Sequence, residues 1–438
     1  MMGTPASSAD EVVRVSGFVK RYKQHRAVNG LDFAVRRGEI YGLIGPDGAG
    51  KSSVLKAIAG VLGYEEGSVD VFGTLLDSER AAEQVKRRIG FLPQGLGLNL
   101  YPELSVEENI DFFAKLRLVP EADLQARKAR LLGITRLDRF RTRLMKQLSG
   151  GMKQKLGLIC TLIHEPELAI LDEPTTGVDP VSRRDFWAIL AEWQAVKGMT
   201  ALVSTAYMDE AVRFHRLSFL SHGRVLASGR PADVQSLVPG LVVTFESTPQ
   251  LEAVARLKRR YTQVESLGPS LHVFTPEQDA EAAVAGIRQA LDNLPATHLR
   301  TDEPELEDVV VALLLKEQDG QTTVSERSGQ SGLSANRPQF DGPAVEAKEL
   351  IRDFGSFRAV DRVSFEMKQG EIFGLLGANG AGKTTTFKIL MGLIRPTSGE
   401  ARILGASVQN VTVRQRIGYL PEQPYFYDYL TAREFLVY

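Results

Sequence analysis

Two glycine-rich stretches have the residue types and the spacing that hold the phosphates of a nucleotide. "GPDGAGKS" at 45–52 and "GANGAGKT" at 377–384 both fit the pattern G-x-x-x-x-G-K-[ST]. An apolar run that predicts a strand comes before each loop ("EIYGLI" and "EIFGLL"), and a helical run follows it. Glycines free such a loop to wrap phosphate oxygens with backbone N–H groups at a helix N-terminus. The residues expected to contact nucleotide are Gly45, Pro46, Asp47, Gly48, Ala49, Gly50, Lys51, Ser52 and Ser53 in the first loop, and Gly377, Ala378, Asn379, Gly380, Ala381, Gly382, Lys383, Thr384 and Thr385 in the second.

The lysine and the hydroxyl that close each loop have separate expected roles. Lys51 and Lys383 would neutralise the β- and γ-phosphates, while the hydroxyls of Ser52 and Thr384 would bind Mg²⁺. An ordinary glycine-rich turn is the alternative for one match. Two matches in the same context make that alternative weak.

The stretch "LAILDEP" at 168–174 is an apolar run that ends in two acids. This pattern is typical of a buried parallel strand that delivers carboxylates at its C-terminal end. We expect Asp172 to belong to the Mg²⁺ shell and Glu173 to polarise the attacking water. A strand followed by an acidic turn is the alternative, and the phosphate loop upstream weakens it.

A long internal repeat relates the two loops. "RRGEIYGLIGPDGAGKSS" at 36–53 aligns with "KQGEIFGLLGANGAGKTT" at 368–385, and "RRIGFLPQ" at 87–94 aligns with "QRIGYLPE" at 415–422. The two halves therefore read as copies of one domain. The first copy continues for well over a hundred further residues, whereas the second stops soon after the match, so we expect the second copy to be incomplete.

The chain between and around the copies predicts four regions. They are a first nucleotide-binding domain at 11–229, a small α+β subdomain at 230–316, a flexible linker at 317–343 and the front part of a second nucleotide-binding domain at 344–438. The subdomain is expected because strand-like and helical runs alternate. The linker is expected because its composition is rich in Gly, Ser and Gln.

A third motif makes the family resemblance specific. "QLSGGMKQK" at 147–155 places Ser149, Gly150 and Gly151 before a helical run, which alone could be an ordinary serine N-cap. The loop, LSGG and LDEP in this order and spacing resemble the ATP-binding-cassette (ABC) ATPases, over residues 11–230 and over 344–438 for the front of a second cassette. The implied fold class is α/β, a P-loop NTPase cassette with a small α+β C-terminal subdomain, followed by a partial second cassette.

The resemblance implies further roles. Gln94 is similar to the glutamine that senses Mg²⁺ and contacts the transmembrane partner, and residues 177–179 resemble the loop that crosses to the opposite cassette. Tyr22 resembles the aromatic residue that stacks on adenine, with Phe354 as its counterpart; a half-buried strand aromatic is the alternative. In this family two cassettes meet head to tail, so each ATP lies between one cassette's phosphate loop and the other's signature, here Ser149, Gly150 and Gly151.

Two departures from the family pattern qualify these roles. Ala206 in "STAYMDEA" stands where the family usually has a histidine that holds the γ-phosphate and the attacking water, which implies slow turnover. In the second copy, Glu422 replaces the glutamine, with Gln423 beside it. That copy also has no signature, no acidic strand end and no switch region, so we expect its hydrolytic half to be missing.

The leading functional expectation is an ATPase subunit that powers export through a separate membrane permease. "EPELEDVVVALL" at 303–314 resembles the ending of exporter-type ABC ATPases. The expected cofactors are ATP and Mg²⁺, and the expected partners are permease subunits and a second cassette. No apolar run approaches the ~20 residues of a membrane span and no secretory signal is visible, so a partner would have to anchor the chain at a membrane. The resemblance implies a cytoplasmic location at the inner face of the plasma membrane, bound to the permease.

Two alternatives stay open. A soluble ABC ATPase acting on ribosomes or nucleic acid would need basic surfaces. The chain has 53 Lys and Arg against 54 Asp and Glu, so its charges nearly cancel and no nucleic acid partner is expected. A nonhydrolytic ATP-binding fragment is the second alternative, favoured by Ala206 and by the incomplete second copy. The single cysteine, Cys160, cannot form an internal disulfide, which fits a reducing compartment.

Overall fold

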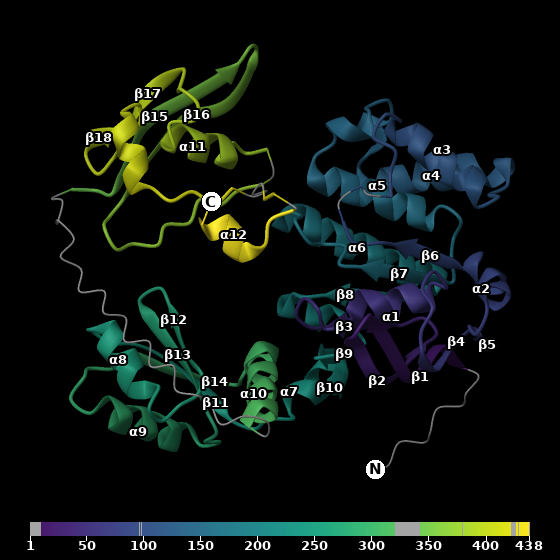
Figure 1. Ribbon diagram of the computed structural model, residues 1–438, viewed down its shortest axis with the longest axis horizontal. Coiled ribbons are helices and arrows are strands. Elements are labelled where there is room, and N and C mark those ends of the chain that lie inside the picture. Colours follow the sequence, from purple (N-terminus) through teal and green to yellow (C-terminus); the bar gives the residue numbers. More distant parts are fainter. Residues whose placement is uncertain are drawn as a thin grey trace. The chain divides into compact units, whose positions relative to one another are not determined.

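The computed structural model describes residues 10–95, 97, 99–319, 342–378, 380–421, 426–427 and 429–437 (Figure 1). These residues form two compact units, and the main boundary between them lies between residues 319 and 342. Most of the predicted linker, together with Asn379, Glu422 and Gln423, lies outside the described residues. Within them, no helix is long and apolar enough to cross a membrane.

A six-stranded sheet forms the centre of the first unit. Its strand order is β10-β9-β3-β8-β7-β6, parallel throughout except for β10, which pairs antiparallel with β9. The bounds are β3 Ile40–Ile44, β6 Ile89–Leu92, β7 Leu168–Asp172, β8 Thr200–Thr205, β9 Arg216–Ser221 and β10 Arg224–Gly229. Every residue of β3, β7 and β8 is buried, as expected for parallel strands covered on both faces.

A second, antiparallel sheet covers the helix that follows β3. It has the order β2-β1-β4-β5, with β1 at Glu11–Tyr22, β2 at His25–Arg36, β4 at Glu66–Val71 and β5 at Thr74–Leu75. Helix α1 (Lys51–Ile58) buries Val54 and Leu55 in one apolar cluster with residues of this sheet and of β3. The phosphate loop is thus placed at a junction of two sheets that share one core.

The helices of the first unit lie mainly after β6. They are α2 Glu79–Lys86, α3 Val106–Leu116, α4 Glu121–Thr135, α5 Gly150–Leu162 and α6 Pro180–Lys197, with short 3₁₀ turns η2 Asp138–Phe140, η3 Met145–Gln147 and η4 Met208–Arg213. Ser105 caps α3, because its Oγ accepts from the Glu108 N–H at 3.2 Å while the Glu108 carboxylate accepts from the Ser105 N–H at 2.8 Å. Helix α5 buries nine of its residues and anchors this helical part to the central sheet.

A small α+β part completes the first unit. Its antiparallel sheet has the order β12-β13-β11-β14, with β11 Leu241–Glu246, β12 Val264–Leu267, β13 Ser270–Thr275 and β14 Thr297–Asp302. Helices α8 (Gln250–Leu257) and α9 (Ala280–Leu291) bury Leu257, Ile287 and Leu291 against Val243, Phe245 and Leu271 of the sheet. Helices α7 (Pro231–Gln235) and α10 (Leu306–Asp319) contact each other where this part meets the central sheet (Figure 1).

The second unit repeats the antiparallel sheet and the loop helix of the first. Its sheet has the order β16-β15-β17-β18, with β15 Val345–Phe354, β16 Phe357–Met367, β17 Ser398–Ile403 and β18 Ala406–Ser407. Its helices are α11 Lys383–Leu390 and α12 Ala432–Val437, with a 3₁₀ turn η5 at Val411–Arg416. The antiparallel order matches β2-β1-β4-β5, so the repeat seen in the sequence is also a repeat of structure.

The strand expected at 371–376 is the exception, and that expectation was wrong. Residues 371–378 form no strand, and Ile372 is 100% and Leu376 93% exposed. In the first unit, β3 lies between β8 and β9, which supply its backbone hydrogen-bond partners. Among the described residues of the second unit, no strand pairs with 371–376, so the same apolar run has no partner there.

His164 gives the first unit a testable dependence on pH. Its Nε2 lies 3.1 Å from the Ile89 carbonyl oxygen, and its buried Nδ1 has no partner among the described residues. Burial, with a smaller effect of Arg117, lowers the pKa of His164 to about 4 from 6.5. A histidine with a depressed pKa takes up its proton more readily when unfolded, so stability falls as pH drops from 6.5 towards 4.

We therefore expect His164→Gln to make the first unit less sensitive to acid. The shift corresponds to at most about 3 kcal/mol of unfolding free energy across this pH range. Urea unfolding of wild type and variant at pH 7.5 and pH 5 measures the difference. Equal losses of stability in the two proteins would contradict the assignment of this pH dependence to His164.

Candidate functional site

The first phosphate loop joins the end of β3 to the start of α1. Gly48 and Gly50 have φ values of 80° and 97°, in the left-handed region that favours glycine. A Cβ atom on Gly50 would lie 2.8 Å from the carbonyl oxygen of Ala27 and 2.7 Å from Cγ2 of Val28. The loop can therefore take this shape against β2 only with glycine at position 50.

Lys51 is the buried cation of the site. It is 4% exposed, and its Nζ donates to the carbonyl oxygens of Gly45 at 2.7 Å and Pro46 at 3.1 Å. The same Nζ lies 3.2 Å from Oε1 of Glu173. A buried ammonium needs anionic or carbonyl partners, and here the loop and one carboxylate supply them. The polyanion of a nucleotide could replace these partners.

Asp172 is the fully buried carboxylate at the end of β7. Its Oδ1 accepts from Ser52 Oγ at 3.1 Å and from Ser204 Oγ at 2.6 Å. Its Oδ2 is buried with no partner among the described residues. Buried polar atoms are normally satisfied, and Mg²⁺ favours carboxylate and hydroxyl oxygens together with water. The donor set of Asp172 and Ser52 therefore fits a hydrated Mg²⁺ ion.

Glu173 joins Lys51 to Gln94. Gln94, which follows β6, donates from Nε2 to Glu173 Oε2 at 2.7 Å, and Thr176 donates to the same oxygen at 3.4 Å. Glu173 has φ 47°, an uncommon value for a residue other than glycine. Such backbone strain tends to occur at functional sites. The arrangement holds a carboxylate beside the phosphate loop, where it can orient water.

Sequence reasoning missed Ser204 at the end of β8. Its Oγ donates to Asp172 and accepts from the Glu173 N–H at 2.9 Å, so one hydroxyl fixes both acids. The only signal was its place at the end of a buried apolar run, two residues before Ala206. Because β8 lies directly beside β7 in the sheet, the contact follows from a strand order that the sequence does not display.

Tyr22 contacts helix α1 beside the phosphate loop, whereas the signature residues lie at the start of α5. The Tyr22 hydroxyl, at the end of β1, is hydrogen bonded to Ser53 Oγ on α1 at 3.2 Å, and the residue is 46% exposed. Ser149 caps α5, its Oγ accepting from the Met152 N–H at 3.4 Å, and Gly150 and Gly151 open that helix. In the described chain, no hydrogen bond or ion pair joins these three signature residues to Lys51, Asp172 or Glu173.

The second loop has the same local form with fewer neighbours. Lys383 Nζ donates to the carbonyl oxygens of Gly377 and Ala378, and Gly382 has φ 89° before α11. Thr384 and Thr385 lie in the first turn of α11, and Phe354, at the end of β15, is 47% exposed. No carboxylate pairs with Lys383 among the described residues of this unit.

Comparison with known proteins places these features in a family. A family model described as ABC transporter matches residues 28–176 and 360–435. A probable multidrug ABC transporter ATP-binding protein of Escherichia coli, YbhF, is 38% identical over 97% of this chain and 72% of its own length. The Nod factor export ATP-binding protein I of Ralstonia nicotianae is 32% identical over 72% of this chain and 97% of its own length. The daunorubicin/doxorubicin resistance ATP-binding protein DrrA of Streptomyces peucetius is 33% identical over 71% of this chain and 94% of its own length.

Fold and site together define a P-loop nucleotide-binding cassette. The chain belongs to the ATP-binding proteins of the ABC transporter family, whose cassettes bind and hydrolyse ATP. The predicted family and fold class are thus confirmed, including the partial second cassette, which the family model matches at 360–435.

Proposed function

We propose that this chain is the Mg-ATP-hydrolysing subunit of an exporter and acts through a separate membrane permease. The observation that carries the proposal is the joined set of Lys51, Asp172, Glu173 and Gln94 beside a phosphate loop. The printed names of the relatives concern multidrug transport, Nod factor export and daunorubicin resistance, which support export. In this proposal the chain works at the inner face of the membrane, bound to its permease.

Each residue of the site has one task in the proposed reaction. Lys51 exchanges its carbonyl and carboxylate partners for the β- and γ-phosphates, and Glu173, released from it, accepts a hydrogen bond from the attacking water. Asp172, Ser52 and Gln94 would hold the Mg²⁺ shell, and the ion would neutralise charge that develops on the phosphates. Tyr22 packs against the adenine. Ala206 provides no imidazole beside the γ-phosphate, so turnover is slow.

A second cassette completes the proposed assembly. Ser149 is exposed at the start of α5, and it caps that helix rather than serving the nucleotide site of its own unit. We infer that Ser149, Gly150 and Gly151 act on ATP held by another cassette, arranged head to tail. That cassette is another copy of this chain or the completed second half, with Lys383, Thr384 and Phe354 in the matching roles.

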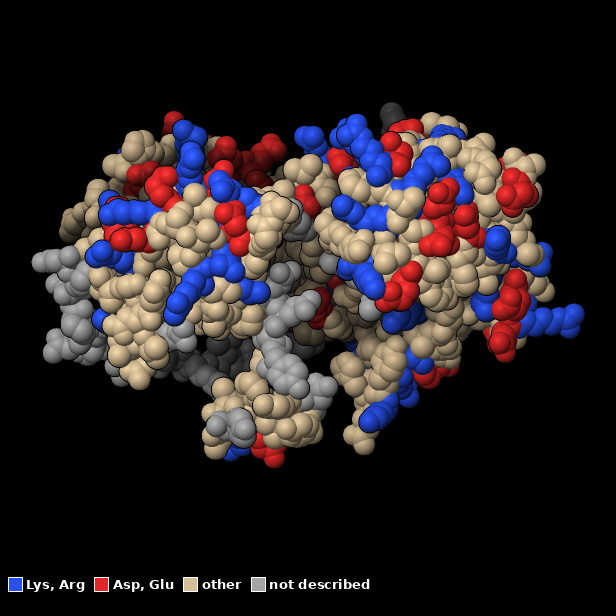
Figure 2. Space-filling model, turned by 90° about the horizontal axis from the view of Figure 1, so that it is seen from above, with Lys and Arg blue, Asp and Glu red and all other residues tan. Residues whose placement is uncertain are grey.

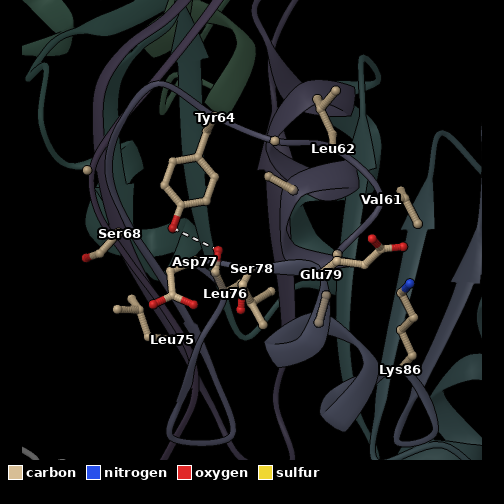
Figure 3. A pocket seen from close by; sticks show the side chains of 15 residues that line it. Val61, Leu62, Tyr64, Ser68, Leu75, Leu76, Asp77, Ser78, Glu79 and Lys86 are labelled. Atoms are coloured by element: carbon tan, nitrogen blue, oxygen red, sulfur yellow. Dashed lines mark hydrogen bonds between the residues drawn. The ribbon is translucent and has the colours of Figure 1, made fainter.

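A groove on the first unit is suited to the permease (Figure 3). It encloses about 660 Å³ between the end of α1, the segment that leads to β4, strand β5 and the start of α2. Val61 and Leu75 line it and are 58% and 46% exposed. Lys86, which lines the groove, is tied to the helical part, because Arg117, just after α3, donates to its carbonyl oxygen at 3.0 Å. The lining also includes Asp77, Glu79 and Lys86, so the groove offers both apolar and charged contacts to a short helix of a membrane protein.

Charge on this groove's walls should break the proposed docking. In cells that contain the permease, we expect the double variant Val61→Glu, Leu75→Glu to be lost from the membrane fraction. The reason is that docking would desolvate two carboxylates at the interface. Leu251→Glu, at a position 85% exposed on α8, is the matched control. Sedimentation of a tagged chain measures the effect. Retention of the double variant at wild-type level would contradict the groove as the docking site.

A binding-only role is the second candidate, and Ala206 is the observation that favours it.

A role on nucleic acid is less well supported, because Lys, Arg, Asp and Glu side chains are interspersed over the face of the described residues seen in Figure 2. A phosphate backbone is normally met by a continuous basic surface. Phosphate release from ATP separates the binding-only role from the proposed one.

A further inference from the structure

A cavity of about 400 Å³ lies in the α+β part, away from the nucleotide site. One wall is the end of α10, with Ala312, Leu315 and Lys316. The other walls include Tyr261, Phe274 and Arg260. The volume falls within the range of small-molecule sites, and the lining combines apolar surface with two cations.

We propose that this cavity binds a small amphipathic anion and that its occupancy changes the rate of ATP hydrolysis through α10. The apolar body lies against Phe274 and Leu315, and the acid group is held by Arg260 and Lys316. The binding half of this proposal is independent of the function proposed above, whereas the rate half rests on it.

The charge of the lining selects an anion. Arg260 donates to the Gln289 side chain at 2.7 Å and to the Gly286 carbonyl oxygen at 3.4 Å, both of which are neutral. Neither Arg260 nor Lys316 forms an ion pair with a carboxylate in the described part of the chain. The charge of Glu277 reaches Tyr261 of the same cavity, but Glu277 forms no ion pair with Arg260 or Lys316. Two cations beside an apolar cavity, neither in an ion pair among the described residues, are best matched by a ligand that carries negative charge.

The opposite face of α10 packs on the cassette. Val310 is 2% exposed and belongs to the apolar cluster that contains Ala211 of η4 and Phe214, and Leu306 and Leu314 pack against the same cluster. Leu313 packs against both this cluster and the cluster on the cavity side. Helix α10 also contacts η4 directly. Helix α10 therefore contacts two regions. Its final turns border the cavity, and its apolar face packs on the segment after Ala206.

The segment that α10 contacts is connected to the catalytic carboxylates. It follows β8, whose Ser204 is hydrogen bonded to both Asp172 and Glu173. In η4 itself, Glu210 accepts from Nε1 of Trp187 at 3.0 Å. A shift of α10 would therefore reach both the acids of the site and the environment of Trp187.

Two contacts hold α10 on the cavity side. His272 of β13 lies 3.1 Å from Asp308 of α10. Val309 and Ala312 of α10 pack with Val238, which lies in the segment between α7 and β11, and Phe274 of β13 packs against this cluster. These contacts hold the helix close to Phe274. A ligand inserted between α10 and the sheet changes this packing, and the change is passed to η4 because α10 is one rigid helix.

Dodecanoate tests both halves of the proposal on the full chain, below its critical micelle concentration. The chain has two tryptophans, Trp187 and Trp193, both buried in the cassette, so their emission reports on the region beside η4. We expect saturable binding by calorimetry, a saturable change in tryptophan emission, and an ATP hydrolysis rate changed at least about twofold. Dodecanol and dodecyltrimethylammonium, which lack the negative charge, should bind at least about tenfold more weakly.

Two single variants locate the binding. Lys316→Gln and Arg260→Gln should each weaken dodecanoate at least about fivefold, because each removes one charge from the pair that meets the acid group. Lys258→Gln, just after α8, is the control of equal charge change. Equal affinity in all three variants, or equal binding of dodecanol, would overturn the site. Normal binding without any change in emission or hydrolysis would overturn the coupling through α10.

Discussion

Lys51→Ala is expected to weaken Mg-ATP binding to the first cassette at least about 100-fold, because a charge-assisted contact to the β- and γ-phosphates is lost. The structure adds a second effect. Nζ of Lys51 is also the partner of the buried Glu173 carboxylate, at 3.2 Å. Its removal leaves Glu173 next to the phosphates without compensation, so repulsion adds to the lost attraction.

Calorimetry of the full chain with Mg-ATP measures this effect. Lys56→Ala is the matched control, since Lys56 is exposed on the same helix α1 and should leave the affinity unchanged. Thermal unfolding of both variants shows whether the fold is kept. Unchanged affinity at the first cassette in Lys51→Ala would exclude this loop as the nucleotide site.

Glu173→Gln is expected to keep Mg-ATP affinity within about threefold and to lower hydrolysis at least about 100-fold. Glutamine retains the shape of the side chain and can accept from the Gln94 amide, which donates to Glu173 at 2.7 Å. It cannot polarise water as a carboxylate does. Binding and turnover should therefore separate in this variant.

Steady-state phosphate release, with affinity measured in parallel, checks the separation. Glu192→Gln, at an exposed position of α6, removes the same charge far along the helix and should behave as wild type. Hydrolysis at the wild-type rate in Glu173→Gln would mean that another group activates the water.

The sequence predicted those parts of the site whose residues are close together in the chain. The phosphate loop and the acid pair at the end of β7 are each contained in fewer than ten residues, and their glycines and apolar runs predict their own local structure. The ion pair between Lys51 and Glu173 and the bond from Gln94 were not predicted as contacts. They depend on β3, β6 and β7 lying in one sheet, with their carboxyl ends at one edge.

The residue that the sequence reasoning missed and the strand that it wrongly expected have the same physical origin. Ser204 was missed because its role depends on β8 lying beside β7, an arrangement set by long-range packing. The strand expected at 371–376 is absent because an apolar run becomes a strand only when neighbours pair with it, as β8 and β9 pair with β3. The contacts that α10 makes on two sides were also not predicted from the sequence. The helical periodicity of its apolar residues indicates which faces are buried, but not which elements cover them.

Single-turnover hydrolysis tests the central claim, that this chain is an ATPase, most directly. The full chain is present in excess over γ-labelled ATP, together with Mg²⁺, so that every labelled ATP molecule is bound. Hydrolysis can then be followed even at the slow rate that we propose for a site with Ala206. We expect labelled phosphate to form in a single phase in wild type and to be lost in Glu173→Gln, while both proteins retain bound nucleotide. Bound ATP that stays intact in wild type as long as in Glu173→Gln would contradict the account and identify a binding-only protein.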